Sequence, residues 1–377
     1  MTETQLRQVG DDEHSGEAQH VDAPRLLLHG LDSLYVCYYL ELVTSNLDFE
    51  DLEYRKQLVK DGQQGQEFLE LGSERFMLKA YGQKPYRYVL ENEAFSVALG
   101  ENMSPSLKVQ FYSAALWRDG AMALHGRIHA WAESMGAHRN RPEVVSRADW
   151  AFDFNLPAID FDENHFASRA RKDAKYRESG APQTFVFGTD QTVVRVYDKV
   201  AEIEQASGKA WFYDLWGQRK DVWRVEFQVR GDRLKQGGIR TMEDLEALQG
   251  DLLRELASNH TTLRVPSPDS NRSRWPFHPL WQALFAAVAA LPQLGLSRSY
   301  DPANLIEYRL AVQVRSLYGS LKALGALLAL QAGQSGEQVS LDRLTARLPR
   351  LLDRHHSEVH WAAEIEDRIR KHEMGQW

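Results

Sequence analysis

The pattern of hydrophobic and polar positions divides the chain into two parts of different character. Between residues 24 and 231, short runs rich in β-branched and aromatic residues are separated by turn residues, which indicates β-strands. Further on the strand-like runs stop, and apolar residues recur at helical spacing in 241–257, 278–291, 302–332, 341–353 and 359–371. We therefore expect an α+β protein: an antiparallel β-sheet with helices packed on one face, followed by a helical C-terminal region.

Local composition suggests where these parts begin and end. Residues 1–23 are polar and acidic, and we predict a disordered tail there. The clearest linker is the stretch 259–276, which is rich in Ser, Pro and Asn. We therefore predict one α+β domain at 24–260 and the helical region at 261–377.

Several further elements are expected inside the α+β domain. Helical spacing predicts helices at 49–60 and 121–135, and a third at 162–177 that carries a cluster of basic residues. The apolar run 107–117 predicts a strand. Residues 188–191, Gly-Thr-Asp-Gln, separate two strand-like runs and predict a hairpin.

Two predicted strands combine an apolar face with a polar one. The strand 193–199 places three reactive side chains on one face: Arg195, Tyr197 and Lys199. The strand 222–230 also alternates, and its polar face carries Arg224, Glu226, Gln228 and Arg230. A site that cuts a phosphodiester needs a nucleophile, acids and cations, so these polar faces are candidate catalytic surfaces.

A third predicted strand, 144–154, carries two carboxylates on one face. Asp149 and Asp153 are four residues apart and share that face with Arg147. Carboxylates within reach of Glu226 would suit Mg²⁺ or Mn²⁺, which are hard cations that prefer oxygen ligands. The alternative is that both aspartates face solvent beside Arg147.

The order of these motifs resembles the replication initiation factor family. The residues that carry the resemblance are Arg-Ala-Asp-Trp-Ala-Phe-Asp at 147–153, Val-Arg-Val-Tyr-Asp-Lys at 194–199, and Val-Trp-Arg-Val-Glu-Phe-Gln-Val-Arg at 222–230. This family comprises rolling-circle Rep proteins of plasmids, with relatives in filamentous phages and in one class of conjugative relaxase. The motifs span about a quarter of the chain.

The resemblance implies a role for each polar side chain on these strands. Tyr197 would be the nucleophile, and it would form a covalent 5′-phosphotyrosine. The implied metal ion, Mg²⁺ or Mn²⁺, would be held by three acids: Asp149, Asp153 and Glu226. Charge in the reaction would be managed by three cations: Lys199, Arg195 and Arg224.

Other residues stay open for these roles. Tyr176 and Tyr213 are alternative nucleophiles, and Glu202 is a further candidate ligand. Arg224 and Glu226 would suit a structural cross-strand salt bridge equally well.

The function implied by the resemblance is enzymatic. We expect a rolling-circle replication initiator of a plasmid, phage or other mobile element, that is, a metal-dependent endonuclease that nicks DNA at a specific site and transfers the strand. Its partners would be single-stranded or cruciform origin DNA and a helicase of the host or element, because the chain has no GxxxxGK[ST] phosphate-binding motif of its own. Two alternatives are a conjugative relaxase of an integrative element, with the same chemistry, and a non-catalytic DNA-binding regulator that keeps the fold.

The net charge of −8 argues against a general nucleic-acid binder, but the charge is unevenly distributed. Residues 1–22 carry −5, whereas residues 219–240 and residues 165–177 carry +4 each. DNA responds to the local potential. We therefore expect the DNA-binding residues to be Arg169, Arg171, Lys172, Lys175, Arg177 and Arg230.

The histidines and the single cysteine offer little chemistry on sequence grounds. His125 and His129 are spaced i,i+4, which can bind zinc, but no third ligand is evident. His356 and His360 lack the adjacent Glu of the zinc-protease motif. No His-hydrophobic-His triplet occurs, so a nicking site would have to be built from carboxylates. Cys37 lies in an apolar run and is expected to be a buried core residue.

The chain shows no membrane-spanning or secretory segment. The most apolar run, 280–296, is interrupted by Pro292 and Gly295, and residues 1–22 lack an apolar signal region. A single cysteine fits a reducing compartment, so we expect a cytoplasmic protein with no membrane partner. The C-terminal helices are expected to form a packing and oligomer surface, consistent with a homodimer, or alternatively to contribute to DNA specificity.

Overall fold

The computed structural model forms two compact units. The residues it describes are 23–42, 46–62, 67–178, 181–294, 302–333, 339–353 and 356–373. The two units divide between residues 298 and 299, further along the chain than the boundary near residue 260 that the sequence suggested. Apart from residue 23, the predicted disordered tail lies outside the described residues.

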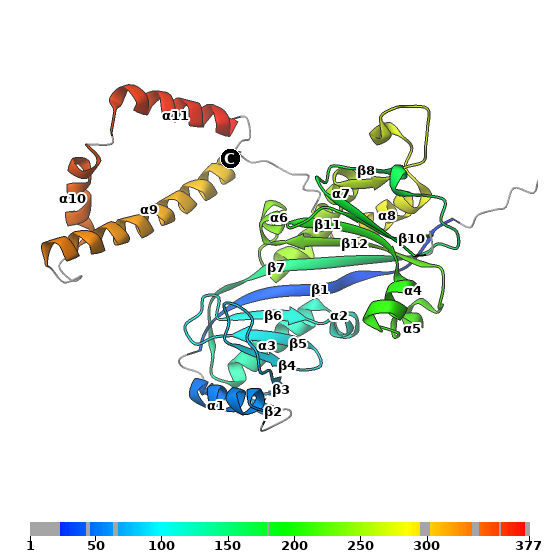
Figure 1. The fold of residues 1–377 in the computed structure, drawn as a ribbon, viewed down its shortest axis with the longest axis horizontal. Helices are drawn as coiled ribbons and strands as arrows, with labels where there is room; N and C mark the ends of the chain where they lie inside the picture. The colour runs from blue at the N-terminus through cyan, green and yellow to red at the C-terminus, as the bar shows by residue number, and fades with distance from the viewer. Residues whose placement is uncertain are drawn as a thin grey trace, which may run out of the picture. The chain divides into compact units, whose positions relative to one another are not determined.

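Among the described residues, the first unit is built on an antiparallel sheet of eleven strands (Figure 1). Their order across the sheet is β2-β3-β4-β5-β6-β1-β7-β12-β11-β10-β9. In chain order the strands are β1 (Arg25–Glu41), β2 (Glu67–Leu71), β3 (Glu74–Leu78), β4 (Tyr88–Glu91), β5 (Phe95–Leu99), β6 (Leu107–Phe111), β7 (His138–Asn155), β9 (Asp173–Glu178), β10 (Ala181–Phe187), β11 (Thr192–Asp198) and β12 (Val222–Arg230). A separate pair, β8 (Phe166–Ser168) and β13 (Thr261–Leu263), forms a small second sheet.

Helices connect the strands of this unit. They are α1 (Phe49–Lys60), α2 (Ser113–Asp119), α3 (Ala121–Ser134), α4 (Lys199–Glu202), α5 (Phe212–Trp216), α6 (Gly231–Gln236), α7 (Met242–Asn259) and α8 (Pro279–Ala289). Asp48 and Thr241 begin α1 and α7, because each side chain accepts hydrogen bonds from backbone N–H groups of the first turn. The helices predicted at 49–60 and 121–135 are confirmed.

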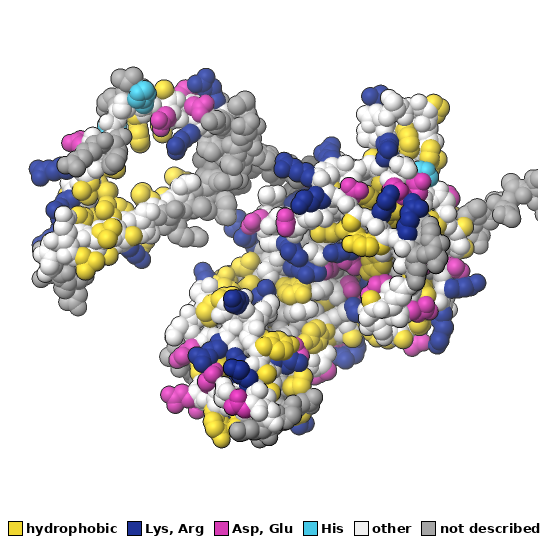
Figure 2. All heavy atoms as spheres, viewed as in Figure 1, with side chains coloured by type: hydrophobic (Ala, Val, Ile, Leu, Met, Phe, Trp, Pro, Cys, Tyr) yellow, Lys and Arg dark blue, Asp and Glu magenta, His cyan; other side chains and the backbone are white. Residues whose placement is uncertain are grey.

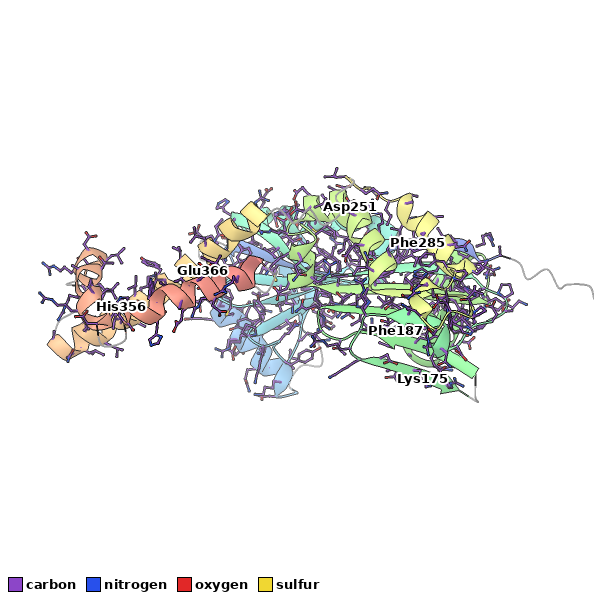
Figure 3. The ribbon with its side chains drawn as sticks, turned by 90° about the horizontal axis from the view of Figure 1, so that it is seen from above. Lys175, Phe187, Asp251, Phe285, His356 and Glu366 are labelled. Carbon is purple, nitrogen blue, oxygen red and sulfur yellow. The ribbon has the colours of Figure 1, made fainter. Side chains whose placement is uncertain are left out.

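One face of the sheet forms the main hydrophobic core. Side chains of β1, β7, β11 and β12 pack there against α3, α7 and α8. The indole N–H of Trp281 in α8 donates to the carbonyl oxygen of Ala257 in α7 at 2.9 Å, which ties the two helices together. Figure 3 shows α7 and α8, marked by Asp251 and Phe285, on the same side of the sheet. The predicted α+β fold, with its larger helices packed on one face, is confirmed.

The opposite face carries the polar side chains, and short helices cover one end of it. In the chain, α4 and α5 lie between β11 and β12 (Figure 1). Phe212 and Trp216 of α5 form a second hydrophobic cluster with Ile203 and Val222, and Trp117 of α2 packs against it. Beyond this cluster, polar side chains of β7 and β11 stay partly exposed.

Two predicted elements are wrong, and one turn is confirmed. The segment 162–177 is not a single helix, because its residues from Asp173 onward belong to β9, which pairs with β10 at the edge of the sheet. The segment 107–117 is a strand only as far as Phe111, since Ser113 begins α2. The hairpin is confirmed, because residues 188–191 join β10 to β11.

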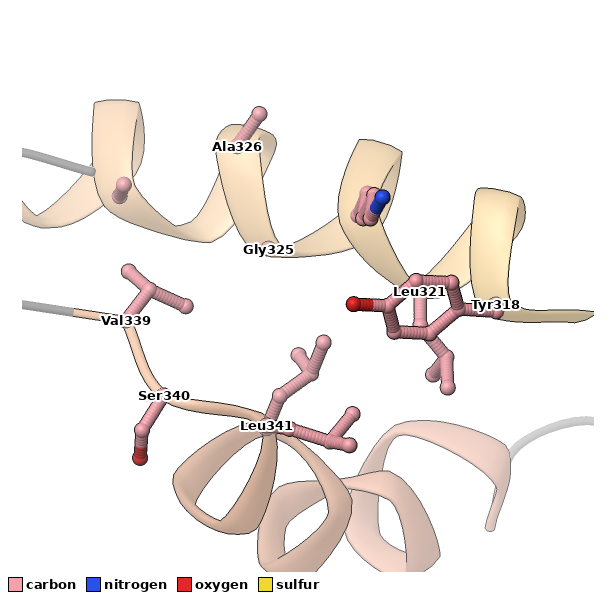
Figure 4. Close-up of a pocket in the computed structure, with 10 residues that line it drawn as sticks. Tyr318, Leu321, Gly325, Ala326, Val339, Ser340 and Leu341 are labelled. Carbon is pink, nitrogen blue, oxygen red and sulfur yellow. The ribbon is translucent and has the colours of Figure 1, made fainter. Parts of the chain in front are cut away.

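The second unit contains the helices predicted at the C-terminus, which are confirmed as α9 (Pro302–Ala332), α10 (Leu341–Leu352) and α11 (Glu358–Glu373). Between α9 and α10 lies a pocket of about 290 Å³ (Figure 4), lined by side chains that include Tyr318, Leu321, Val339 and Leu341. No helix in the described part of the chain is both long enough and apolar enough to cross a membrane.

Candidate active site

Three adjacent strands bring the three sequence motifs together. β7, β12 and β11 lie side by side in the sheet. Asp153 lies opposite Arg224, and Arg224 in turn lies opposite Tyr197. Arg195 lies opposite Glu226. Directly paired residues on antiparallel strands point to the same face, so these five side chains share the polar face of the sheet.

Tyr197 is buried within this polar surface. Its side chain is 6% exposed, and it belongs to neither of the hydrophobic clusters described above. Its hydroxyl donates a hydrogen bond to Oε2 of Glu226 at 2.9 Å. Burial raises the pKa of Tyr197 well above its usual value, and the charge of Glu226 adds to the effect. The tyrosine is therefore a neutral phenol at neutral pH.

A chain of polar contacts connects Glu226 to Gln228 and Arg147 along the same face. Its Oε1 accepts a hydrogen bond from Arg195 at 2.7 Å. The amide oxygen of Gln228 accepts a hydrogen bond from Arg195 at 3.2 Å and another from Arg147 at 3.0 Å. These two arginines are about one-third exposed, so they give the open part of the face a positive rim.

Asp149 lies at the far end of this chain. Both of its carboxylate oxygens accept hydrogen bonds from Arg147, and the shortest of these is 2.5 Å. Burial raises the pKa of Asp149 to about 6, and the bonds and charge of Arg147 only partly offset that effect. Asp149 is therefore close to the point at which it gains or loses a proton near neutral pH.

Asp153 and Arg224 form a fully buried ion pair. Nε and a terminal nitrogen of Arg224 donate to the two oxygens of Asp153 at 2.6 and 2.8 Å, and neither side chain is exposed. The indole N–H of Trp216 donates a third hydrogen bond to Asp153 at 2.9 Å. The guanidinium of Arg224 also lies over the ring of Phe212, 4.6 Å from its centre. Arg224 therefore anchors α5 to the sheet from below the surface.

Asp32 is a member of this network that the sequence did not single out. It lies in an irregular part of β1, where the pairing with β7 shifts between Leu31 and Ser33. Its carboxylate is 3.3 Å from Arg224 and 3.4 Å from Lys209. It also accepts hydrogen bonds from two residues of α2: Ser113 at 2.7 Å and Trp117 at 3.0 Å. The sequence feature that could have revealed Asp32 is a single acid inside an apolar run, since a buried acid needs partners.

Lys199 lies next to the ring of Tyr197. Its side chain is almost fully buried and forms an ion pair with Glu202 one turn along α4. Its amine lies 5.6 Å from the ring centre of Tyr197 and 5.4 Å from that of Phe212. Burial lowers the pKa of Lys199 from its usual value, and the charge of Arg224 contributes. Glu202, which the sequence offered as a further candidate metal ligand, therefore forms an ion pair with this lysine instead.

The three acids expected to hold a metal ion are spaced along this network. Each is paired with its own arginine. Among the described residues, these acids do not form a group of three side chains close enough to hold one ion, whereas one such group of His and Glu side chains lies elsewhere. Glu226 fits a metal best, since its side chain is 12% exposed and adjoins Tyr197. Asp153 fits least, because both its oxygens accept hydrogen bonds from buried donors.

Five of the six basic residues expected to bind DNA lie on or just before the edge strand β9. Arg169, Arg171 and Lys172 precede β9, while Lys175 and Arg177 lie on it. Lys175 and Arg177 both form ion pairs with Glu163. Arg230 is the last residue of β12 and is exposed. Figure 2 shows basic side chains over the part of the molecule that holds α6, β11 and β10.

The alternative nucleophiles lie apart from the polar network. Tyr176 lies on β9 and is 60% exposed. Tyr213 lies on α5, where Arg219 lies over its ring at 5.5 Å. Neither tyrosine has a hydrogen bond to an acid among the contacts that the structure describes, whereas Tyr197 has one to Glu226.

The similarities of this chain to known proteins are similarities of structure. No protein-family model and no curated protein matches this chain. The solved structure of the rolling circle replication initiator protein from Geobacillus stearothermophilus is similar to 71% of this chain and 98% of its own length. The two chains are 18% identical in sequence, and the TM-score is 0.43.

Proposed function

We propose that this protein nicks DNA and transfers the cut strand through a covalent bond between Tyr197 and a 5′ phosphate. The observation that carries the proposal is the hydrogen bond from the Tyr197 hydroxyl to Glu226, on a face that Arg195 makes positive. A nucleophilic phenol needs an acceptor for its proton and cations for its developing charge, since its usual pKa is about 10.

In the proposed reaction one phosphate ester replaces another. The oxygen of Tyr197 bonds to phosphorus, the bond from phosphorus to the 3′ oxygen breaks, and the 3′ end takes up a proton and leaves as a hydroxyl. The phenol proton passes to Glu226, to which it already points. The number of ester bonds is unchanged, so the reverse reaction rejoins DNA ends without ATP. Lys199 and Arg195 stabilise the negative charge that develops.

The proposal includes a divalent cation, Mg²⁺ or Mn²⁺. Glu226 and Asp149 would hold it, with Asp153 as a third ligand only if Arg224 moves away. When bound, such an ion polarises the scissile phosphate and lowers the charge that the nucleophile meets. Hard cations of this kind prefer carboxylate oxygens, which is the donor set present here.

The biological setting that we propose is the start of rolling-circle replication of a plasmid, phage or integrative element. The support is the order of the three motifs, whose residues β7, β11 and β12 bring onto one face. The DNA partner would be single-stranded or cruciform origin DNA. A conjugative relaxase would use the same chemistry, and the need for an accessory protein in nicking would distinguish it.

The test is a search for a covalent adduct. The full chain is incubated with labelled single-stranded DNA from candidate origins and with Mg²⁺ or Mn²⁺, then denatured in SDS. We expect a labelled protein band that is absent with chelator and absent in Tyr197→Phe, but present in Tyr176→Phe. An adduct that persists in Tyr197→Phe would exclude Tyr197 as the nucleophile. Absence of an adduct on every DNA would contradict the enzymatic proposal.

The burial of Tyr197 favours a second candidate, a DNA-binding regulator that keeps the fold without catalysis. At 6% exposure the phenol cannot reach a phosphate without movement of the residues around it. This candidate predicts that Tyr197→Phe leaves both DNA binding and biological activity intact. The enzymatic proposal predicts that DNA binding survives and activity is lost.

A further inference from the structure

A second group of titratable side chains lies on the other face of the sheet. His125 and His129 are one turn apart on α3, and Glu143 lies on the neighbouring strand β7. Glu143 is placed on the core face by register, because Val145 two residues on pairs with Val36 and both are in the main core. The sequence showed the two histidines but not the third residue, which is 14 positions beyond His129.

These three side chains converge on one point. One ligand atom from each can be chosen so that all lie within 4.8 Å of one another. Nε2 of His125 is 3.8 Å from Oε1 of Glu143. The centres of the His125 and His129 rings are 4.6 Å apart, and the rings meet edge to face. Ligands of a tetrahedral zinc ion are about 3.3 Å apart, since each bond is about 2.0 Å. A shift of about 1 Å in the side chains would therefore close the site around an ion.

One polar group in this cluster lacks the partner that burial requires. Nε2 of His129 is buried, and no described residue forms a hydrogen bond with it. Glu143 is 2% exposed. It accepts a hydrogen bond from the backbone N–H of Met242 at 3.1 Å and forms an ion pair with Arg139 at 3.7 Å. A buried imidazole nitrogen without a partner is costly unless something binds it, and the adjacent buried carboxylate could share that ligand.

The surroundings favour the form of these residues that binds metal. Burial lowers the pKa of both His125 and His129, so both rings are neutral at pH 7. Nδ1 of His125 is hydrogen-bonded to the hydroxyl of Tyr38 at 2.9 Å, which orients the ring with Nε2 toward Glu143. An outer partner of this kind is typical of a metal-binding histidine.

We propose that His125, His129 and Glu143 bind a zinc-type transition metal ion, at a site separate from the acids beside Tyr197. Two imidazoles and one carboxylate are a donor set that suits Zn²⁺ rather than Mg²⁺, and a water molecule would complete the tetrahedron. The ion would join α3 to β7 and, through the backbone of Met242, to the start of α7. Its role would be structural, because the site faces the hydrophobic core.

The experiment uses the full chain after removal of metal with a chelator. Co²⁺ is then titrated in, and its visible absorption is recorded, since four-coordinate Co²⁺ absorbs far more strongly than the hydrated ion. We expect one ion per chain, displaced by Zn²⁺. In His129→Gln the affinity falls by about 10²-fold or more. The matched control is His356→Gln, which alters a histidine with the same spacing to His360 in the second unit.

A folding defect is separated from a binding defect by thermal melting. Excess Zn²⁺ should raise the melting temperature of the unaltered protein and of His356→Gln, because an ion that binds only the folded state stabilises it. It should not raise that of His129→Gln, whose far-UV circular dichroism reports whether it folds. Equal Co²⁺ affinity in His129→Gln and the unaltered protein would overturn the proposal. So would the absence of strong Co²⁺ absorption.

Discussion

The hydroxyl of Tyr197 and the carboxylate of Glu226 are joined by a hydrogen bond of 2.9 Å between two neighbouring strands. The phenol is buried and neutral. Through this bond it is linked to Glu226, and through Glu226 to the partly exposed cation Arg195. The bond fixes the direction in which the phenol can lose its proton. It also makes Glu226 the residue on which both the metal and the nucleophile depend in the proposed reaction.

Glu226→Gln tests this dependence. The amide keeps the shape of the side chain and can still accept the hydrogen bond from Tyr197, but it loses the charge that would take up the proton and hold the ion. We expect adduct formation to slow by about 10²-fold or more, measured as the initial rate on single-stranded DNA. Glu204→Gln, at an exposed residue, should leave the rate unchanged. A rate for Glu226→Gln within about threefold of the parent would contradict the role given to Glu226.

The buried pair of Arg224 and Asp153 predicts a large loss of stability. In Arg224→Ala, Asp153 is left as an unpaired charge with no exposure, and Asp32 loses a cation 3.3 Å away. The free energy of unfolding in urea should fall by about 3–5 kcal/mol. Arg224→Lys should recover only part of it, because an ammonium cannot reproduce the two parallel bonds.

The control for this prediction is Lys220→Ala, because that side chain is on the surface. Its effect should be within about 0.5 kcal/mol. If Arg224→Ala also costs less than about 1 kcal/mol, the pair does not anchor α5 to the sheet in the way described.

Sequence patterns predicted the strands that carry the candidate site better than the contacts among their side chains. The alternation in 222–230 gave β12 with its observed bounds, since the side-chain period of a strand depends only on its own residues. The same period placed Arg195, Tyr197 and Glu226 on polar faces. It could not show that Glu226 would pair with Arg195, because that contact depends on the register between β11 and β12.

The residues that the sequence did not reveal come from distant parts of the chain. Asp32 reaches Arg224 across 192 positions, and it does so from a stretch of β1 where regular pairing breaks. Glu143 completes a site with two histidines of another element. The error at 162–177 has a similar cause, since pairing of β9 with β10 outweighs the local helical spacing of its basic residues.

Asp32 predicts acid sensitivity. Burial alone would raise the pKa of Asp32, but the charges of Arg224 and Lys209 and two hydrogen bonds lower it well below its usual value. A folded-state pKa below the unfolded one contributes stability that is present above about pH 4 and is lost as the pH falls further. Stability measured in urea from pH 5 to pH 2 should therefore fall less steeply in Asp32→Asn, from a lower starting value. An unchanged slope would contradict this account.

The pairing of Lys175 and Arg177 with Glu163 predicts that this acid restrains DNA binding at the sheet edge. Both cations form ion pairs with the one carboxylate, so their charge is partly neutralised in the free protein. Glu163→Gln would leave both cations free for phosphates, and we expect tighter binding of single-stranded DNA at low salt, with a steeper dependence on salt concentration.

The double change Lys175→Ala and Arg177→Ala should weaken binding and reduce that slope by about one to two. Asp214→Asn removes one negative charge from an exposed residue of α5 and serves as the control for net charge. If Glu163→Gln binds DNA no better than this control, the DNA lies elsewhere on the protein.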